Sequence, residues 1–332
     1  MTKKLKILCA PANEGGCSYY RIIGPYKKLE ELYGDQVEFR YNTNPLGIVE
    51  LGEGKGTWQP DWTFEDMKWA DIIWTNNISN WGGPYTARIV GKAKEFGKFV
   101  HYDTDDLLTD LYKGHRLYDT YKERDLENVT KFIYSNSDLV GRENCHWGFY
   151  GAPLPVMGED GKNKDEWQHE VWRNYKKIML QGFKGSPNWQ IYNALPPDSY
   201  GGIYSNVDIS IAPLQMNSFN DSKSEIKVAE CGRYKIPLIA SDVGCYDETI
   251  VNGKTGYLLP ANAPASDWAK VLIKCIKNPK HVIEMGENLH KITEEYFDLN
   301  KVVKHRLELY EQAIGLVHGR DQEQKITYNS DW

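Results

Sequence analysis

The sequence predicts an α/β protein with parallel sheets, and three observations lead to this fold class. Strand-like and helix-like segments alternate from one end of the chain to the other, a pattern typical of sheets whose strands are joined by helices. The chain has 332 residues, enough for two domains of ordinary size. Hydrophobic residues make up 41% of it and charged residues 26%, so we expect a globular fold rather than a disordered chain.

The elements follow from the spacing of the apolar residues. Short apolar runs predict buried strands, and apolar residues spaced by three or four predict helices. In the first half the predicted strands cover residues 6–10, 37–41, 70–75, 99–102 and 132–135, and the predicted helices cover residues 20–32 and 84–96. The glycine-rich residues between 42 and 64 are expected to form a long surface loop.

The second half starts near residue 152 and continues the alternation. Its predicted strands cover residues 154–157, 177–181, 188–192, 207–212, 237–240 and 257–259. Its predicted helices cover residues 165–175, 268–276, 282–296 and 301–314. We therefore expect an α/β domain in each half.

Composition narrows the class of protein. The formal net charge of −6 argues against a broad nucleic-acid surface, because phosphate binding needs clustered lysine and arginine. The six cysteines form neither a Cys-x-x-Cys pair nor a cluster with zinc spacing, which favours free thiols in a reducing compartment. No apolar stretch has the character of a signal peptide or a membrane helix, so the protein is expected to be cytoplasmic, without integral membrane contact.

Residues 219–256 are the most informative part of the chain. They begin with a polar loop that has a helix N-cap signature, residues 220–224, followed by a short helix that carries Lys227 and Glu230 on one face. A buried strand at residues 236–241 then ends in a second loop of small residues. Two helix starts at one sheet edge suit a nucleotide diphosphate, because helix N-termini hold phosphates and an acid can hold the ribose hydroxyls.

This segment resembles the C-terminal domain of the retaining glycosyltransferases of family 4, which have the GT-B fold. The positions that match the family pattern are Phe219, Asn220, Lys223, Ser224, Lys227, Glu230, Pro237, Ala240, Ser241, Gly244, Glu248, Ile250, Gly253 and Gly256. Two positions depart from it. Lys235 replaces a glycine, and Ser222 stands where many members have the first of two glutamates.

The resemblance implies two Rossmann-like domains that face each other across a cleft. Residues 1–151 would be the acceptor-side domain and residues 152–305 the nucleotide-sugar domain. Residues 306–332 would form a helix and tail that pack back on the first domain.

The resemblance also implies how the second domain binds its donor. The expected donor-binding residues at the diphosphate are Ser222, Lys223, Ser224 and Lys227, and Glu230 is expected at the ribose. In this fold lysine or arginine side chains and helix dipoles neutralise the donor phosphates. We therefore expect neither a metal nor a cofactor.

A glycine-containing loop follows the first predicted strand. Gly15 and Gly16 permit a tight turn and let backbone N–H groups approach a ligand at the carboxyl end of a parallel strand. The loop resembles a variant common in bacterial and phage sequences. This resemblance implies that Arg21 projects toward the cleft as a partner for an anion. The alternative is a plain turn with Arg21 as a surface charge.

Polar residues also cluster at the end of the strand predicted at 99–102. In related glycosyltransferases a His or Asp of this loop contacts the transferred sugar or the acceptor. The candidate catalytic residues here are His101, Asp103, Asp105 and Asp106. The aspartates also suit Mg²⁺ or Mn²⁺, but a metal motif of this kind is typical of the other major glycosyltransferase fold, GT-A. One of the aspartates is expected to cap the following helix.

The resemblance implies transfer of a sugar from a nucleotide-diphosphate donor to an acceptor hydroxyl, with retention of the anomeric configuration. The acceptor is expected to be a glycan, or hydroxymethylated DNA if a phage encodes the protein. Two other interpretations stay open: a GT-B nucleotide-sugar epimerase, and a nucleotide-sugar-binding protein without activity, which the glutamate missing at Ser222 makes conceivable. The sequence also leaves the oligomeric state open, a homo-oligomer included.

Overall fold

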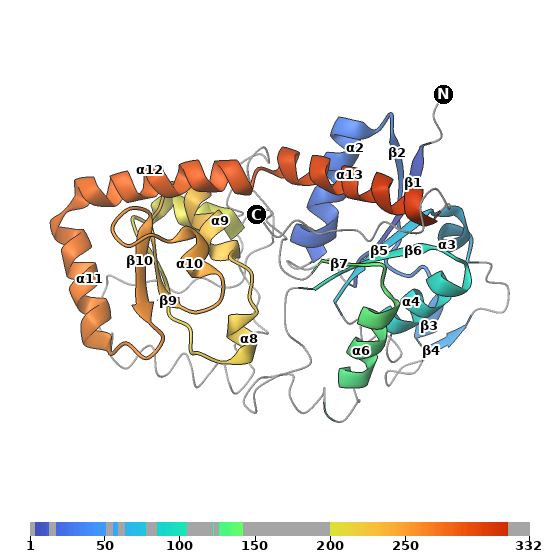
Figure 1. Ribbon diagram of the computed structural model, residues 1–332, viewed down its shortest axis with the longest axis horizontal. Helices are drawn as coiled ribbons and strands as arrows, with labels where there is room; N and C mark the ends of the chain where they lie inside the picture. Colours follow the sequence, from blue (N-terminus) through green and yellow to red (C-terminus); the bar gives the residue numbers. More distant parts are fainter. Residues whose placement is uncertain are drawn as a thin grey trace.

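The structure is a computed structural model that describes residues 4–12, 18–50, 56–58, 64–77, 85–104, 122, 126–141 and 200–317. The described part forms two lobes, each built on its own sheet, and two long helices in line run across both of them (Figure 1). No helix within the ranges just given is long and apolar enough to cross a membrane.

The sheet of the first lobe has five strands, all paired in parallel, in the order β2-β1-β5-β6-β7. The strands are β1 (Leu5–Ala10), β2 (Val37–Tyr41), β5 (Ile72–Asn76), β6 (Phe99–Asp103) and β7 (Leu139–Gly141). The chain places β2 on one side of β1 and the later strands on the other side. The strand order therefore reverses between β1 and β5, which is where open α/β sheets bind ligands outside the carboxyl ends of their strands.

Helices cover both faces of this sheet, so its inner strands β1, β5 and β6 are mostly buried, whereas the edge strand β2 is mostly exposed. Along β1, Ile7 and Cys9 contribute to one core, while Leu8 and Ala10 contribute to the other. The helices of this lobe are the π-helix η1 (Tyr19–Ile23), α2 (Gly24–Tyr33), α3 (Glu65–Trp69), α4 (Tyr85–Glu95) and α6 (Leu126–Asn136). Of these, η1 and α2 pack against the first core, and α3, α4 and α6 pack against the second.

The described sheet of the second lobe has three parallel strands in the order β10-β9-β8. They are β8 (Ser210–Ala212), β9 (Leu238–Asp242) and β10 (Gly256–Pro260). The helices around them are η3 (Tyr200–Asn206), α8 (Ser218–Asp221), α9 (Ile226–Arg233), α10 (Tyr246–Thr249), α11 (Ala265–Lys277) and α12 (Pro279–Tyr296). Of these, α12 lies very close to α9 and the turn after it, because a Cβ atom at Gly286 would lie 1.9 Å from the carbonyl oxygen of Lys235.

The two long helices carry the chain from the second lobe back to the first. Phe297, just after α12, is buried in the core of the second lobe. Leu299, only two residues later, starts α13 (Leu299–Val317) and is buried in the core of the first lobe. Val303, Leu307 and Tyr310 continue this buried stripe against the sheet. The predicted fold, α/β with parallel sheets and a C-terminal helix that returns to the first domain, is confirmed.

Some predicted elements differ from the observed ones. Residues 132–135 are not a strand but belong to α6, and the fifth strand is β7. Residues 42–64 are not one irregular loop, because β3 (Ile48–Glu50) and β4 (Gly56–Trp58) pair there in antiparallel fashion. The elements predicted between residues 154 and 192 lie outside the described residues.

Candidate functional site

Two loops meet at the carboxyl edge of the second-lobe sheet, one between α8 and α9 and the other between β9 and α10. The Gly244 N–H donates to Oδ1 of Asp221 at 3.2 Å, and the Cys245 thiol contacts the carbonyl oxygen of Lys223, also at 3.2 Å. Gly244 has a φ of +67°, and a Cβ atom there would lie 3.3 Å from two carbonyl oxygens of the facing loop. Glycine is therefore required at this position for both conformation and space. The two loops predicted from the sequence are indeed neighbours.

Glu230 lies on α9 and is almost completely buried. Its Oε2 atom accepts hydrogen bonds from the Tyr204 hydroxyl at 2.6 Å and from Nζ of Lys227 at 2.7 Å. Both bonds fall on the same oxygen, and no donor from the described part of the chain reaches Oε1. Lys227 is partly exposed, with 36% of its side chain accessible. The pair therefore combines a buried carboxylate with a cation at the surface, one turn apart on a single helix face.

The other donor-binding candidates of the second lobe lie in the turn before α9. Lys223 is half-buried, with its Nζ atom 4.3 Å from the ring centre of Phe219. The Ser222 hydroxyl donates to the carbonyl oxygen of Ser218 at 2.8 Å, and Ser224 is half-buried. The structure thus groups Ser222, Lys223 and Ser224 at the amino end of the helix that carries Lys227 and Glu230.

The predicted N-cap within residues 220–224 is wrong. The N-cap position of α9 is Glu225, whose side chain makes no capping hydrogen bond. Glu225 is buried, and its Oε2 atom lies 2.7 Å from the sulfur of Cys245. Burial first and the Glu225 carboxylate second raise the pKa of the Cys245 thiol, so this cysteine stays protonated. Asn217 instead caps the short helix α8.

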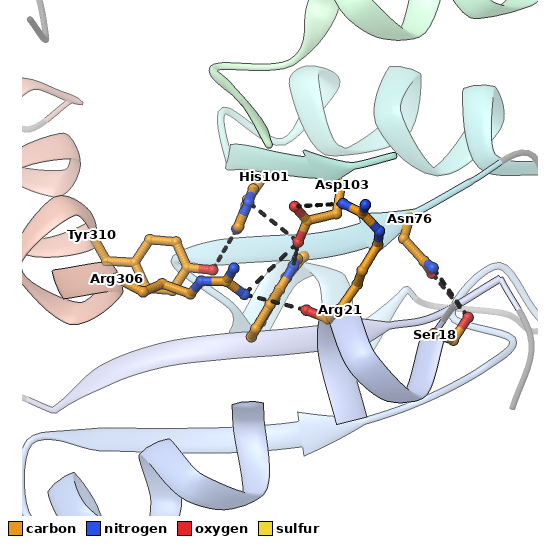
Figure 2. A network of polar contacts seen from close by, with 8 residues as sticks. Ser18, Arg21, Asn76, His101, Asp103, Arg306 and Tyr310 are labelled. Carbon is orange, nitrogen blue, oxygen red and sulfur yellow. Dashed lines mark hydrogen bonds and ion pairs between the residues drawn. The ribbon is translucent and has the colours of Figure 1, made fainter. Parts of the chain in front are cut away.

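A second cluster lies in the first lobe and is centred on Asp103, at the carboxyl end of β6 (Figure 2). Asp103 is completely buried, and its Oδ2 atom accepts a hydrogen bond from Nε1 of Trp74 at 2.7 Å. Nη1 of Arg306 lies 3.8 Å from Oδ2, and Nη1 of Arg21 lies 4.0 Å from Oδ1. Burial alone would raise the pKa of Asp103, but His101, Arg306 and Arg21 outweigh it and hold this pKa well below its usual value. Asp103 is therefore an ionised carboxylate between two guanidinium groups.

His101 is the second buried member of this cluster. Its ring stacks on Trp74 with centroids 5.2 Å apart, its Nδ1 atom lies 2.5 Å from the Tyr310 hydroxyl oxygen, and its Nε2 atom lies 3.5 Å from Oδ2 of Asp103. A carboxylate can only accept, which assigns the proton to Nε2 and lets Nδ1 accept from Tyr310. Burial, the largest influence, lowers the pKa of His101 although Asp103 acts in the opposite direction.

The position of this cluster changes the expected role of its members. Arg306 and Tyr310 lie on α13, and Arg306 also donates to the backbone carbonyl of Arg21 at 3.2 Å. The cluster therefore attaches the returning helix to the first lobe. His101 and Asp103 were expected to contact a sugar, and Arg21 was expected to project into a cleft, but all three side chains are 3% exposed or less. Glu230 is as deeply buried, so burial alone does not decide the role. We interpret these three residues as ones that position α13, because their polar atoms already bind one another and two side chains of that helix.

Asn76 organises the point where the strand order reverses. Its Oδ1 atom accepts from the Ala12 N–H at 3.0 Å, and its side chain exchanges hydrogen bonds with the Ser18 hydroxyl at 3.1–3.2 Å (Figure 2). It thereby ties both ends of the loop after β1 to the end of β5. The candidates Gly15 and Gly16 of that loop, and the candidates Asp105 and Asp106, lie outside the described residues.

Sequence reasoning missed several residues of both clusters: Trp74, Asn76, Tyr204, Arg306 and Tyr310. One signal was available for two of them. Arg306 and Tyr310 follow Leu299 and Val303 on the same stripe of the C-terminal helix, and an arginine on an apolar stripe indicates a buried partner. In the described part of the chain, no group of three or more His, Cys, Asp or Glu side chains is arranged to hold a metal ion.

Known proteins resemble this chain in part of its sequence and in its whole fold. Residues 172–292 match the family model described as glycosyl transferases group 1. No curated protein sequence is significantly similar to the chain. Sucrose-phosphate synthase from Thermosynechococcus elongatus superposes with a TM-score of 0.61 at 14% identity, over 94% of this chain and 100% of that one.

Two further solved structures are similar. A glycosyltransferase from Rickettsia africae has a TM-score of 0.54 at 15% identity, over 97% of this chain and 100% of that one. The Anabaena protein HepE in complex with UDP and glucose has a TM-score of 0.51 at 13% identity, over 93% of this chain and 100% of that one. The chain thus has the GT-B fold seen in these solved structures, and its residues 172–292 match the model of group 1 glycosyl transferases.

Proposed function

We propose that this protein is a retaining glycosyltransferase that moves a sugar from a nucleotide-diphosphate donor to an acceptor hydroxyl. The observation that carries the proposal is the arrangement of Lys227 and Glu230 beside two neighbouring loops at the carboxyl edge of a parallel sheet. The same residues fall within the segment that matches group 1 glycosyltransferases. The binding of UDP and glucose by a protein of the same fold supports a nucleotide sugar as the donor.

Glu230 is the residue that we assign to the nucleoside. A ribose carries hydroxyl donors, and the Oε1 atom of Glu230 is the carboxylate oxygen that Tyr204 and Lys227 do not use. Charge-assisted hydrogen bonds of this kind are short and directional. The buried carboxylate would therefore fix the ribose and, through it, the direction in which the diphosphate leaves the nucleoside.

Lys223 and Lys227 are the cations that we assign to the diphosphate. During transfer the bond between the anomeric carbon and a phosphate oxygen breaks, and the acceptor oxygen forms the new glycosidic bond. The acceptor proton is released, and negative charge accumulates on the departing diphosphate. Cations that are already in place stabilise that charge more than they stabilise the bound donor, and this difference lowers the barrier.

The test compares two variants with two matched controls. Glu230→Ala and Lys227→Ala remove the two members of the α9 pair, while Lys28→Ala and Glu31→Ala remove a pair with the same spacing on α2 of the first lobe. We expect each α9 variant to lose about 2.7–4 kcal/mol of transition-state stabilisation, or roughly 10²–10³-fold in kcat/KM, as for other lost charge-stabilising groups. The two α2 variants should keep the activity of the unaltered protein.

The assay is release of free nucleotide from a panel of nucleotide sugars, with and without acceptor glycans or hydroxymethylated DNA. Release that depends on an acceptor supports a transferase, and the anomeric configuration of the product tests retention. Interconversion of the sugars without an acceptor would instead identify an epimerase, and binding without turnover would identify a binding protein. Equal donor use by the α9 variants and the unaltered protein would refute the assignment of Lys227 and Glu230.

A further inference from the structure

Helix α11 has two faces of different composition. Four residues at helical spacing, Trp268, Val271, Leu272 and Cys275, pack into a core of the second lobe. The opposite face carries Lys270, Ile273, Lys274 and Lys277, which share one side of the helix because they are spaced by three and four residues. An amphipathic helix normally exposes polar residues on this side, so Ile273 in its middle needs an explanation.

The apolar exposure continues past the end of α11. Ile273 is 50% exposed, Ile276 is 72% exposed, and Ile283 near the start of α12 is 65% exposed. In the described ranges, no large hydrophobic side chain is more exposed than Ile276 and Ile283. We call the exposed residues of the end of α11 and the start of α12, namely Ile273, Lys274, Ile276, Lys277, Lys280 and Ile283, the α11 face.

The charges of this surface have one predominant sign. Lys270, at its border, pairs with Asp267 at 2.7 Å, and Glu284 lies 3.6 Å from His281. Lys274 extends over the Tyr257 ring, with its Nζ atom 4.9 Å from the ring centre, whereas Lys277 and Lys280 have no ion-pair partner among the described residues. The α11 face is therefore cationic in a chain whose formal net charge is −6. It lies at the end of the molecule farthest from the first lobe (Figure 1).

We propose that the α11 face docks the protein onto an anionic lipid bilayer. Lysines beside exposed aliphatic side chains are the composition of helices that lie in a membrane interface, where the lysines meet lipid phosphates and the apolar side chains enter the headgroup boundary. The composition does not suit a protein partner, because the centres of protein interfaces are enriched in aromatic residues and arginine and depleted in lysine. Docking through this end would leave the loops around α9 open to substrates.

The test is co-sedimentation of the full chain with vesicles. We expect binding to phosphatidylcholine vesicles that contain phosphatidylglycerol and none to vesicles of phosphatidylcholine alone, and added salt should weaken the binding. The double variants Lys274→Glu/Lys277→Glu and Ile276→Ser/Ile283→Ser should each lower the partition coefficient by about tenfold or more.

The matched controls place the same changes elsewhere. Lys291→Glu/Lys304→Glu makes the same change in net charge on exposed positions of α12 and α13, and Val251→Ser/Leu32→Ser removes two other exposed apolar side chains. Both controls should bind vesicles as the unaltered protein does. Absence of vesicle binding, equal binding to both kinds of vesicle, or equal effects of the face and control variants would overturn the proposal. So would a dimer in light scattering that only the isoleucine variant dissociates, because the face would then bind a second copy of the chain.

Discussion

At the scale of single residues, the geometry of Glu230 depends on aromatic neighbours that are distant in sequence. The Tyr204 hydroxyl bonds the carboxylate, and the Tyr204 ring stacks on Tyr234 with centroids 5.6 Å apart and planes inclined by 20°. Gly201 leaves room for this arrangement, because a Cβ atom there would lie 2.6 Å from the Tyr234 hydroxyl oxygen. The orientation of Glu230, the residue proposed to bind the ribose, is therefore set by η3 and the end of α9 together.

The variant Tyr204→Phe isolates the hydroxyl from the ring. It keeps the stacking on Tyr234 but removes one hydrogen bond from a buried carboxylate, a bond of a type worth about 1.5–3 kcal/mol. We expect the KM for the nucleotide sugar to rise by roughly tenfold or more with a smaller change in kcat, measured by steady-state kinetics. The control is Tyr234→Phe, whose hydroxyl is not bonded to Glu230. A Tyr204→Phe protein with an unchanged KM would show that the hydroxyl does not orient Glu230.

At the scale of elements, two glycines allow α12 to lie in close contact with α9, because a side chain at either position would collide with the neighbouring element. A Cβ atom at Gly286 would meet the backbone of Lys235, which is itself in the left-handed region with a φ of 59°. A Cβ atom at Gly232 would lie 2.2 Å from the hydroxyl oxygen of Thr293. The second lobe is therefore stabilised by a helix pair that tolerates no added methyl group at the crossing.

Gly286→Ala tests this crossing. The new methyl group collides with backbone rather than with a flexible side chain, so we expect a loss of about 1–3 kcal/mol or more in the free energy of unfolding, as for other overpacked sites. Gly315→Ala on α13 is the control, because no atom of the described residues lies within 4 Å of its Cβ position. That substitution should leave stability unchanged or raise it by about 0.5–1 kcal/mol through helix propensity. Urea unfolding followed by circular dichroism measures both, and equal stability of the two variants would contradict the prediction.

The elements that the sequence predicted well are those buried on both sides. Strands such as β1 and β5 stand out as short apolar runs between polar residues, and their observed bounds differ from the predicted ones by one or two residues. Residues 132–135 form an equally short apolar run, and nothing local separates a strand from one turn of a helix there. Leu126, Val129 and Ile133 are spaced by three and four residues, and this longer pattern was the signal for α6.

At the scale of the whole molecule, the buried cluster around Asp103 joins parts of the chain that no local pattern connects. His101 and Tyr310 are 209 residues apart, and Arg21 and Arg306 are 285 residues apart. The sequence indicated that polar residues gather at the end of β6, and it indicated a returning helix through a family resemblance. It could not indicate that the polar residues bind that helix, because a single sequence shows periodicity within elements but not contacts between them.

The same cluster predicts how the attachment of α13 depends on pH. Folded His101 has a lowered pKa, whereas in the unfolded chain a histidine takes up a proton near pH 6.5. Below that pH the unfolded state binds more protons than the folded state, so the stability of the cluster falls as the pH falls, by up to about 1.4 kcal/mol per pH unit. The lowered pKa of Asp103 adds a second loss that begins only near pH 4, where an unfolded aspartate becomes protonated.

Hydrogen exchange of residues 299–317 between pH 7 and pH 5 measures this dependence, after correction for the intrinsic effect of pH on exchange. We expect the protection of α13 to decrease steadily over this range in the unaltered protein. His101→Asn removes the titrating group. In this variant the protection of α13 should be lower at pH 7 than in the unaltered protein and should change little with pH. His305→Asn on the same helix is the control and should keep the full slope, since the His305 side chain is 46% exposed. The same slope in His101→Asn and in the unaltered protein would mean that another group, not His101, controls how the returning helix is held.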